Sequence, residues 1–166
     1  MLVPRPGFPL YQVIAESHGA RVVHYDLMPD EHWECDLRHI ERVILELEQR
    51  TRVGSTSGKL VVQQRRVVRG IVINNPSNPT GSVYSERHLC EILDLAKKYR
   101  IPIVADEIYG DLTYGDAVFH PLVNVASKYR KVVPIITASG LGKQFLVPGW
   151  RVGWLVFYDG GGGALR

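Results

Sequence analysis

The feature that most constrains this chain is the alternation of strand-like and helix-like segments along it. Short apolar, β-branched runs of the kind that form buried strands occupy residues 20–27, 69–76, 101–107, 131–139 and 151–158. Segments with apolar residues at helical spacing lie between them, at residues 11–19, 36–50 and 85–100. Strands that alternate with helices in this way predict an α/β fold, with a three-layer α/β/α arrangement around a mostly parallel sheet.

Each predicted helix has a recognisable boundary or apolar face. Asp36 and Ser85 are suitable N-caps for the second and third helices, and Gly19 is a natural stop for the first. The apolar face of the second helix consists of Leu37, Ile40, Val43, Ile44 and Leu47. The third helix has its apolar face at Leu89, Ile92, Leu93 and Ala96. We expect these faces to pack against the sheet.

Two stretches do not fit the alternating pattern. Residues 51–66 are polar and glycine-bearing and predict an inserted loop, and the glycine-rich tail 159–166 has no core-forming pattern. The remainder, within residues 1–158, is predicted to form part of one domain, with a short apolar start at 2–8 that prolines interrupt. A sheet of so few strands would expose one edge and one face, which indicates an incomplete domain.

Charge and cysteine content narrow the function classes. The chain has 20 basic and 17 acidic residues, and we interpret its arginine cluster at 63–69 as a solvated edge rather than a nucleic-acid site. Cys35 and Cys90 form no metal-binding pattern. No secretory signal or membrane span is expected. We therefore predict a cytoplasmic protein, with mitochondria as the alternative compartment, that binds neither nucleic acid nor membrane and holds no metal.

Polar residues follow three of the predicted strands, at the edge where α/β folds bind ligands. The run NNPSNPTG follows the first of these strands, DEIYGD follows the second, and SGLGK follows the third. Together they supply amide, carboxylate, phenol and amine groups. The sequence therefore predicts a small-molecule site at this edge of the sheet.

Two cations stand in the otherwise apolar and glycine-rich run LGKQFLVPGWRVGW at 141–154. An apolar surround favours the neutral amine of Lys143, which is the form that makes Schiff bases, whereas the ordinary alternative is a surface lysine. Arg151 follows a proline–glycine turn that would return its guanidinium towards the lysine. A guanidinium there would bind phosphate through two parallel hydrogen bonds, and a structural salt bridge is the alternative.

The other candidate residues need partners of their own. Asp106 ends a buried-type strand, so its carboxylate requires a pyridinium nitrogen, an arginine or a helix N-terminus. Tyr109 lies three residues later and would offer its phenol to the same ligand. Asn78 lies in a proline-rich turn, where its amide would either contact the ligand or serve the turn itself.

These motifs resemble those of one known family. NNPSNPTG, ADEIYGDL and GLGKQFLVPGWRVGW, in this order, resemble the fold-type I, class I aminotransferases that use pyridoxal 5′-phosphate. RPGFPLY and LVPGWRVGW resemble the tyrosine aminotransferase branch of that family. The resemblance covers roughly residues 1–158 and leaves out the predicted 51–66 insert. It identifies the chain as part of the large cofactor-binding domain, without the small domain.

The resemblance implies three roles around the reactive part of the cofactor. Lys143 would hold pyridoxal phosphate as a Schiff base and then move a proton between substrate and cofactor. Asp106 would pair with the pyridine nitrogen and keep it protonated. Arg151 would bind the cofactor phosphate.

The resemblance implies three further contacts. Tyr109 and Asn78 would hydrogen-bond the ring oxygen of the cofactor, and Asn78 would also hold the substrate carboxylate. Phe8 would stack on the cofactor ring. One departure is Gly140, which stands where many members have a phosphate-binding serine or threonine.

The resemblance also implies an activity. We expect the full-length protein, a homodimer, to transfer the amino group of an aromatic amino acid to a 2-oxo acid such as 2-oxoglutarate. L-tyrosine is the leading candidate for the amino acid. The alternatives are another fold-type I enzyme, namely an aminocyclopropane-carboxylate synthase or a carbon–sulfur lyase, and an inactive truncated fragment. The absence of the small domain, which supplies an arginine for the substrate carboxylate, favours the last alternative.

Overall fold

The computed structural model describes residues 1–49 and 67–160, and within these ranges all strands belong to one sheet. The strands are β1 (Leu2–Arg5), β2 (Val23–Met28), β3 (Glu34–Cys35), β4 (Ile71–Asn74), β5 (Ile103–Asp106), β6 (Ile135–Gly140) and β7 (Gly153–Tyr158). The α-helices are α1 (Leu10–Ser17), α2 (Leu37–Gln49), α3 (Glu86–Tyr99), α4 (Leu122–Lys128) and α5 (Leu141–Gln144). Single 3-10 turns occupy Pro29–Glu31 and Pro148–Trp150.

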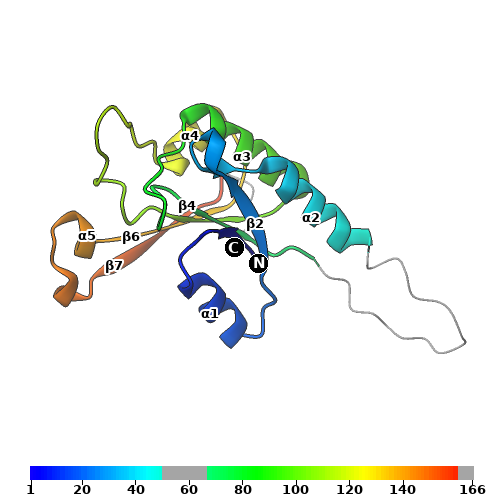
Figure 1. Cartoon of the computed structure of the whole chain (residues 1–166), viewed down its shortest axis with the longest axis horizontal. Coiled ribbons are helices and arrows are strands. Elements are labelled where there is room, and N and C mark those ends of the chain that lie inside the picture. Colours follow the sequence, from blue (N-terminus) through cyan, green and yellow to red (C-terminus); the bar gives the residue numbers. More distant parts are fainter. Residues whose placement is uncertain (50–66, 161–166) are drawn as a thin grey trace, which may run out of the picture.

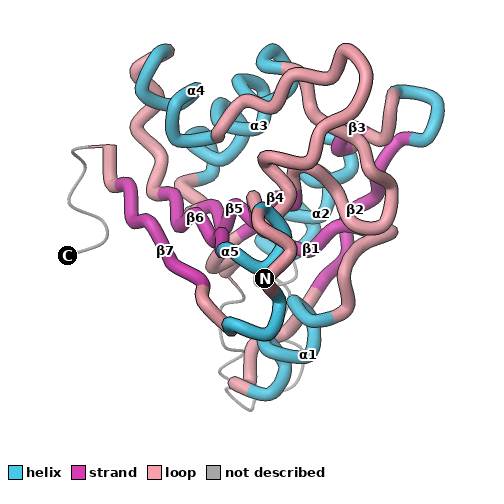
Figure 2. The backbone as a smooth tube through the Cα atoms, turned by 90° about the vertical axis from the view of Figure 1, so that its left-hand side faces the viewer, coloured by secondary structure: helices cyan, strands magenta, loops and turns pink. Residues whose placement is uncertain are grey.

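The sheet is mostly parallel, as predicted. Its strand order is β3-β2-β1-β4-β5-β6-β7, and the neighbours from β2 to β6 all pair in parallel. The two outer strands, β3 and β7, are antiparallel to their neighbours and lie at opposite ends of the sheet (Figure 2). The proline-interrupted start of the chain therefore forms a central strand. The register aligns Asn74 with Asp106 and Asp106 with Ala138, so these carboxyl ends meet at one edge.

The two faces of the sheet are covered unequally. Helices α2, α3 and α4 cover one face, and α1 lies on the other (Figure 1). Along β5, Ile103 and Ala105 are buried, whereas Val104 and Asp106 are only half-buried. Four successive apolar residues of β7, Trp154 to Phe157, are each at least 41% exposed. The prediction of an exposed edge and face is therefore confirmed, and in the described ranges α1 is the one α-helix that packs under the sheet.

The two long helices start and pack as the sequence predicts. Asp36 accepts a hydrogen bond from the backbone N–H of His39 at 2.9 Å, and Ser85 accepts one from that of His88 at 3.2 Å. These side chains satisfy N–H groups that the first helical turn leaves unpaired. The predicted apolar faces lie in or against one core cluster, whose fully buried members include Ile40, Ile44, Leu89, Ile92 and Leu93.

Several short elements escape the sequence pattern. Helix α4, strand β3 and the single turn α5 were not predicted, because each is too short for a periodic signal. The predicted strands also begin later than expected; the one placed at 131–139, for example, is β6 at Ile135–Gly140. The predicted 51–66 insert and residues 161–166 of the predicted tail lie outside the described residues. Among the helices of the described part, none is long and apolar enough to cross a membrane.

Candidate active site

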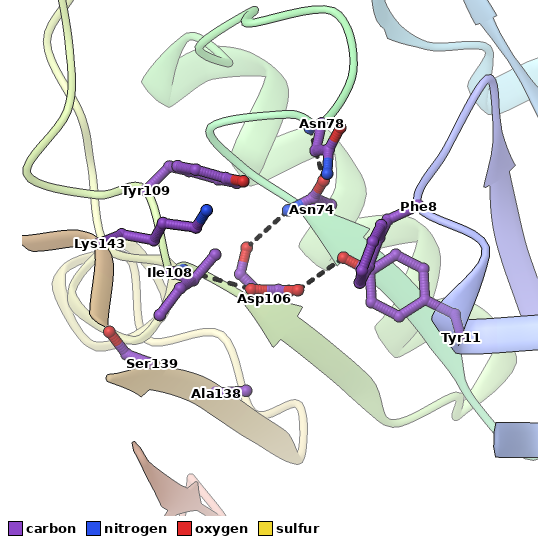
Figure 3. A pocket seen from close by; sticks show the side chains of 10 residues that line it. All are labelled: Phe8, Tyr11, Asn74, Asn78, Asp106, Ile108, Tyr109, Ala138, Ser139 and Lys143. Carbon is purple, nitrogen blue, oxygen red and sulfur yellow. Dashed lines mark hydrogen bonds between the residues drawn. The ribbon is translucent and has the colours of Figure 1, made fainter. Parts of the chain in front are cut away.

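A pocket of about 410 Å³ opens at the carboxyl ends of β4, β5 and β6 (Figure 3). Its volume lies in the range of small-molecule sites. The residues that line it come from all three predicted motifs and from the N-terminal segment: Phe8, Tyr11, Asn74, Asn78, Asp106, Ile108, Tyr109, Ala138, Ser139 and Lys143. The structure therefore has a pocket at the edge of the sheet where the sequence predicts a small-molecule site.

The asparagine-rich turn after β4 is held by its own side chains. Asn74 is buried, and its side-chain oxygen accepts a hydrogen bond from the backbone N–H of Asn78 at 2.7 Å. Its amide nitrogen donates to the carbonyl oxygens of Pro76 and Asp106, at 3.3 and 3.2 Å. The side chain of Asn75 accepts from the backbone N–H of Tyr84. Asn74 and Asn75 thus build the turn, and the turn places Asn78 at the pocket.

The carboxylate of Asp106 lies in the middle of the pocket wall, between two donors. The phenol of Tyr11 donates to Oδ2 at 2.6 Å, and the backbone N–H of Ile108 donates to Oδ1 at 3.2 Å. Burial, followed by the nearby carboxylate acceptor, raises the pKa of the Tyr11 phenol. The phenol therefore remains a hydrogen-bond donor throughout the neutral range.

Lys143 and Phe8 stand on opposite sides of this carboxylate (Figure 3). The ammonium nitrogen of Lys143 lies 5.3 Å from the centre of the Tyr109 ring, within cation–π range. Phe8 lies edge-on to the Tyr11 ring, with 5.8 Å between the ring centres. Lys143 is exposed, so the described part of the chain does not enclose it in the apolar surround that the sequence predicts.

Arg151 is not among the residues that line the pocket. The 3-10 turn Pro148–Trp150 does reverse the chain as predicted, since the backbone N–H of Leu141 donates to the carbonyl of Val152 at 3.2 Å. The side chain of Arg151 is exposed and makes a long 3.4 Å hydrogen bond to the carbonyl of Pro148. Its assignment to a phosphate stays a prediction.

Glu107 directly follows Asp106, but its side chain lies on the opposite side of the strand and contacts the start of α4. Its Oε1 accepts a hydrogen bond from the backbone N–H of Leu122, the first residue of α4, at 2.8 Å. Burial raises the pKa of this carboxyl to about 7, because the loss of hydration outweighs the hydrogen bond from Leu122. This residue holds the long segment 108–121 to the strand end rather than contributing to the pocket.

Comparison with known proteins agrees with this arrangement. The sequence profile described as Aminotransferase class I and II matches residues 1–159. The chain belongs to this family.

Individual members of the aminotransferase family show the same relationship. The chain is 45% identical to tyrosine aminotransferase from Bos taurus over 159 residues, which is 96% of this chain and 30% of the bovine protein. It is 36% identical to nicotianamine aminotransferase A from Hordeum vulgare over 96% of this chain and 29% of that protein. The crystal structure of tyrosine aminotransferase from Leishmania infantum superposes with a TM-score of 0.78 at 32% identity, covering 98% of this chain and 34% of that one. The chain thus spans about a third of the length of these aminotransferases.

The match confirms the family resemblance and the fold, and the structure adds pocket residues that sequence reasoning missed. Tyr11 is the main omission. It lies in the quoted run RPGFPLY, three residues after Phe8, a spacing that places two side chains on one side of a helix start. Ser139, which directly precedes the departure at Gly140, also lines the pocket. Asn74 was read only as part of a motif, and its role in holding the turn follows from contacts that are not visible in the sequence.

Proposed function

We propose that this chain forms the cofactor-binding part of a pyridoxal-phosphate-dependent aminotransferase. Its proposed substrates are an aromatic amino acid, for which L-tyrosine is the leading candidate, and a 2-oxo acid such as 2-oxoglutarate. The observation that carries the proposal is one pocket in which the amine of Lys143 and the carboxylate of Asp106 face the same space. The names of the bovine and Leishmania relatives support the aromatic substrate.

The donor set of the pocket fits pyridoxal phosphate. Lys143 offers an amine for the aldehyde carbon, and Asp106 offers a carboxylate for the ring nitrogen. Tyr109 and Asn78 offer a phenol and an amide for the ring oxygen, with Asn78 also proposed to hold the substrate carboxylate. Phe8 offers an aromatic face for the ring. These five predicted residues all line the pocket, which supports their proposed roles.

The phosphate group is assigned to the end of the pocket near α5. We keep Arg151 as its cation, on the strength of the motif and of the chain reversal at Pro148–Trp150. Ser139, whose hydroxyl lies on the same side of the pocket as Lys143 (Figure 3), is a second candidate for this group.

The proposed chemistry divides between cofactor and protein. When bound, pyridoxal phosphate supplies an electron sink that stabilises negative charge at the substrate α-carbon. The Asp106 carboxylate holds a proton on the ring nitrogen, since a negative charge beside that atom favours its protonated form. The Lys143 amine would accept the proton from the substrate α-carbon as a general base and would then deliver it to the C4′ carbon of the cofactor as a general acid.

The larger assembly is part of the same proposal. We infer that residues 1–158 correspond to part of a large domain, that the protein to which this span corresponds acts as a homodimer, and that it works in the cytoplasm. The apolar side chains of β7 are exposed, and uncovered apolar strands are rare in isolated domains. This exposure supports a larger protein in which another segment covers β7.

The proposal is tested by product analysis with L-tyrosine and 2-oxoglutarate. We expect equal amounts of glutamate and the 2-oxo acid of tyrosine. Release of ammonia or pyruvate in place of these two products would count against transamination, and no product at all would favour the inactive fragment.

A pair of lysine variants then assigns the catalytic amine. Lys143→Ala is expected to lower the turnover by about a thousandfold or more while leaving the fold intact, because it removes the only group proposed to move the proton. Lys97→Ala is the matched control, since Lys97 is an exposed lysine in the last turn of α3, away from the pocket residues. Turnover within tenfold of the unaltered chain in Lys143→Ala would refute the assignment.

A further inference from the structure

We propose that Tyr11 is a positioning residue, whose phenol holds the Asp106 carboxylate in the orientation that receives the ring nitrogen of the cofactor. The inference rests on the proposed function. It adds a side chain from α1, an element outside the three motifs that follow the strands. The phenol does not act on the reacting atoms itself but through Asp106.

Two hydrogen bonds fix the orientation of the Asp106 carboxylate. Tyr11 donates to Oδ2 at 2.6 Å, and the backbone N–H of Ile108 donates to Oδ1 at 3.2 Å. With one donor on each oxygen, rotation of the carboxylate about its bond to the β-carbon would break at least one of the two bonds. Hydrogen bonds to an ionised acceptor are among the stronger ones in proteins, so the plane of the carboxylate is fixed before any ligand arrives.

The position of the Tyr11 ring is itself determined by its surroundings. The ring packs edge-on against Phe8, which lies just before α1, and it is half-buried under the sheet. Phe8 and Tyr11 both line the pocket, on the side opposite Lys143 (Figure 3). One aromatic pair therefore offers a face for the cofactor ring and a phenol for the carboxylate that the ring nitrogen would meet.

The protonation state of the phenol determines which side chain donates in the contact between Tyr11 and Asp106. Burial and the carboxylate acceptor raise the pKa of the Tyr11 phenol, so the phenol keeps its proton and donates it to the hydrogen bond. Tyr11 is therefore the donor in this contact, and each oxygen of the Asp106 carboxylate can still accept from a further donor in the pocket.

The first test needs no cofactor. The chain is labelled at the phenolic carbon of tyrosine, and the Tyr11 signal is assigned by its loss in Tyr11→Phe. In Asp106→Asn the chemical shift of this carbon at neutral pH is expected to change, because the charged acceptor of the Tyr11 hydrogen bond is gone while the ring keeps its packing on Phe8. An unchanged chemical shift in Asp106→Asn would overturn the proposal.

The second test separates positioning from mere packing. The affinity of the chain for pyridoxal phosphate is compared with its affinity for the analogue that has carbon in place of the ring nitrogen. Tyr11→Phe keeps the ring that packs on Phe8 and removes only the hydroxyl. It is expected to weaken the binding of pyridoxal phosphate about tenfold and to leave the analogue within about twofold. Tyr114→Phe is the matched control, because that tyrosine is 82% exposed.

The outcomes distinguish this inference from the proposed function. An equal loss for both ligands would mean that the hydroxyl only stabilises the pocket, and no loss for either would mean that it is dispensable; both results overturn the positioning role. If the unaltered chain does not bind pyridoxal phosphate, the proposed function of the chain fails and the positioning role fails with it. Binding that Tyr11→Phe does not change refutes the positioning role alone.

Discussion

Glutamine in place of Glu107 is expected to stabilise the chain above neutral pH, although the residue accepts a hydrogen bond in the folded state. Glu107 is half-buried directly after β5, and burial raises the pKa of its carboxyl from 4.5 to about 7. A group whose pKa is raised by folding contributes stability below its unfolded pKa, and the contribution is lost as the pH rises through the folded value. Glu107 therefore stabilises the fold least at pH 7 and above.

The size of this effect follows from the two pKa values. A difference of one pKa unit corresponds to about 1.4 kcal/mol, so the shift at Glu107 corresponds to about 3 kcal/mol. Glu107→Gln has no ionisation, and its amide oxygen still accepts from the backbone N–H of Leu122. The unfolding free energy of Glu107→Gln minus that of the unaltered chain should therefore increase by about 3 kcal/mol between pH 4.5 and 7, and then level off.

The assay is urea denaturation of both proteins at a series of pH values across this window. Taking the difference between the two proteins at each pH cancels the titration of all other groups that behave alike in both. Glu46→Gln, at an exposed position on α2, is the surface control and should change the unfolding free energy by less than about 0.5 kcal/mol. A difference that stays constant from pH 4.5 to 7 would refute the reasoning.

Three further predictions concern the elements that support the site. Ser85→Ala removes the side-chain acceptor at the start of α3 and should lower the unfolding free energy by about 1 kcal/mol in urea denaturation. Leu93→Ala, at a fully buried position in the core, should cost about 3 kcal/mol in the same assay, and a cost below about 1 kcal/mol would contradict the packing described for α3. Gly140→Ala would place a methyl group 2.8 Å from the carbonyl oxygen of Val152 and should cost about 2 kcal/mol, seen as a lower melting temperature. Gly149→Ala, whose added methyl meets nothing within 4 Å, is its control and should leave the melting temperature nearly unchanged.

The layered fold is predictable because its long elements carry strong local signals. The helices capped by Asp36 and Ser85 have full apolar faces, and β4 is an uninterrupted apolar run. The short elements have no such signal. Helix α4 depends on a contact between Glu107 and the N–H of Leu122, two residues that lie 15 positions apart, and no local pattern reports such a contact.

The site is predictable where its residues follow strands. Asp106 ends β5, and Asn78 and Lys143 lie in the segments that directly follow β4 and β6. A parallel sheet brings such strand ends together regardless of sequence distance. Tyr11 could not be assigned in this way, because its partner Asp106 lies 95 positions away and the contact depends on how α1 packs under the sheet. The exposure of Lys143 is likewise a property of how much chain surrounds it and not of its neighbours in sequence.

The most direct test of the account is the covalent capture of the cofactor on this chain. The purified chain is incubated with pyridoxal phosphate, reduced with borohydride and digested, and the labelled peptide is identified by mass spectrometry. We predict label on Lys143 alone, because its amine is the one that shares a pocket with Asp106, Tyr109 and Asn78 in the described part of the chain. No label, or label distributed over several lysines, would contradict the claim that this chain builds the cofactor site.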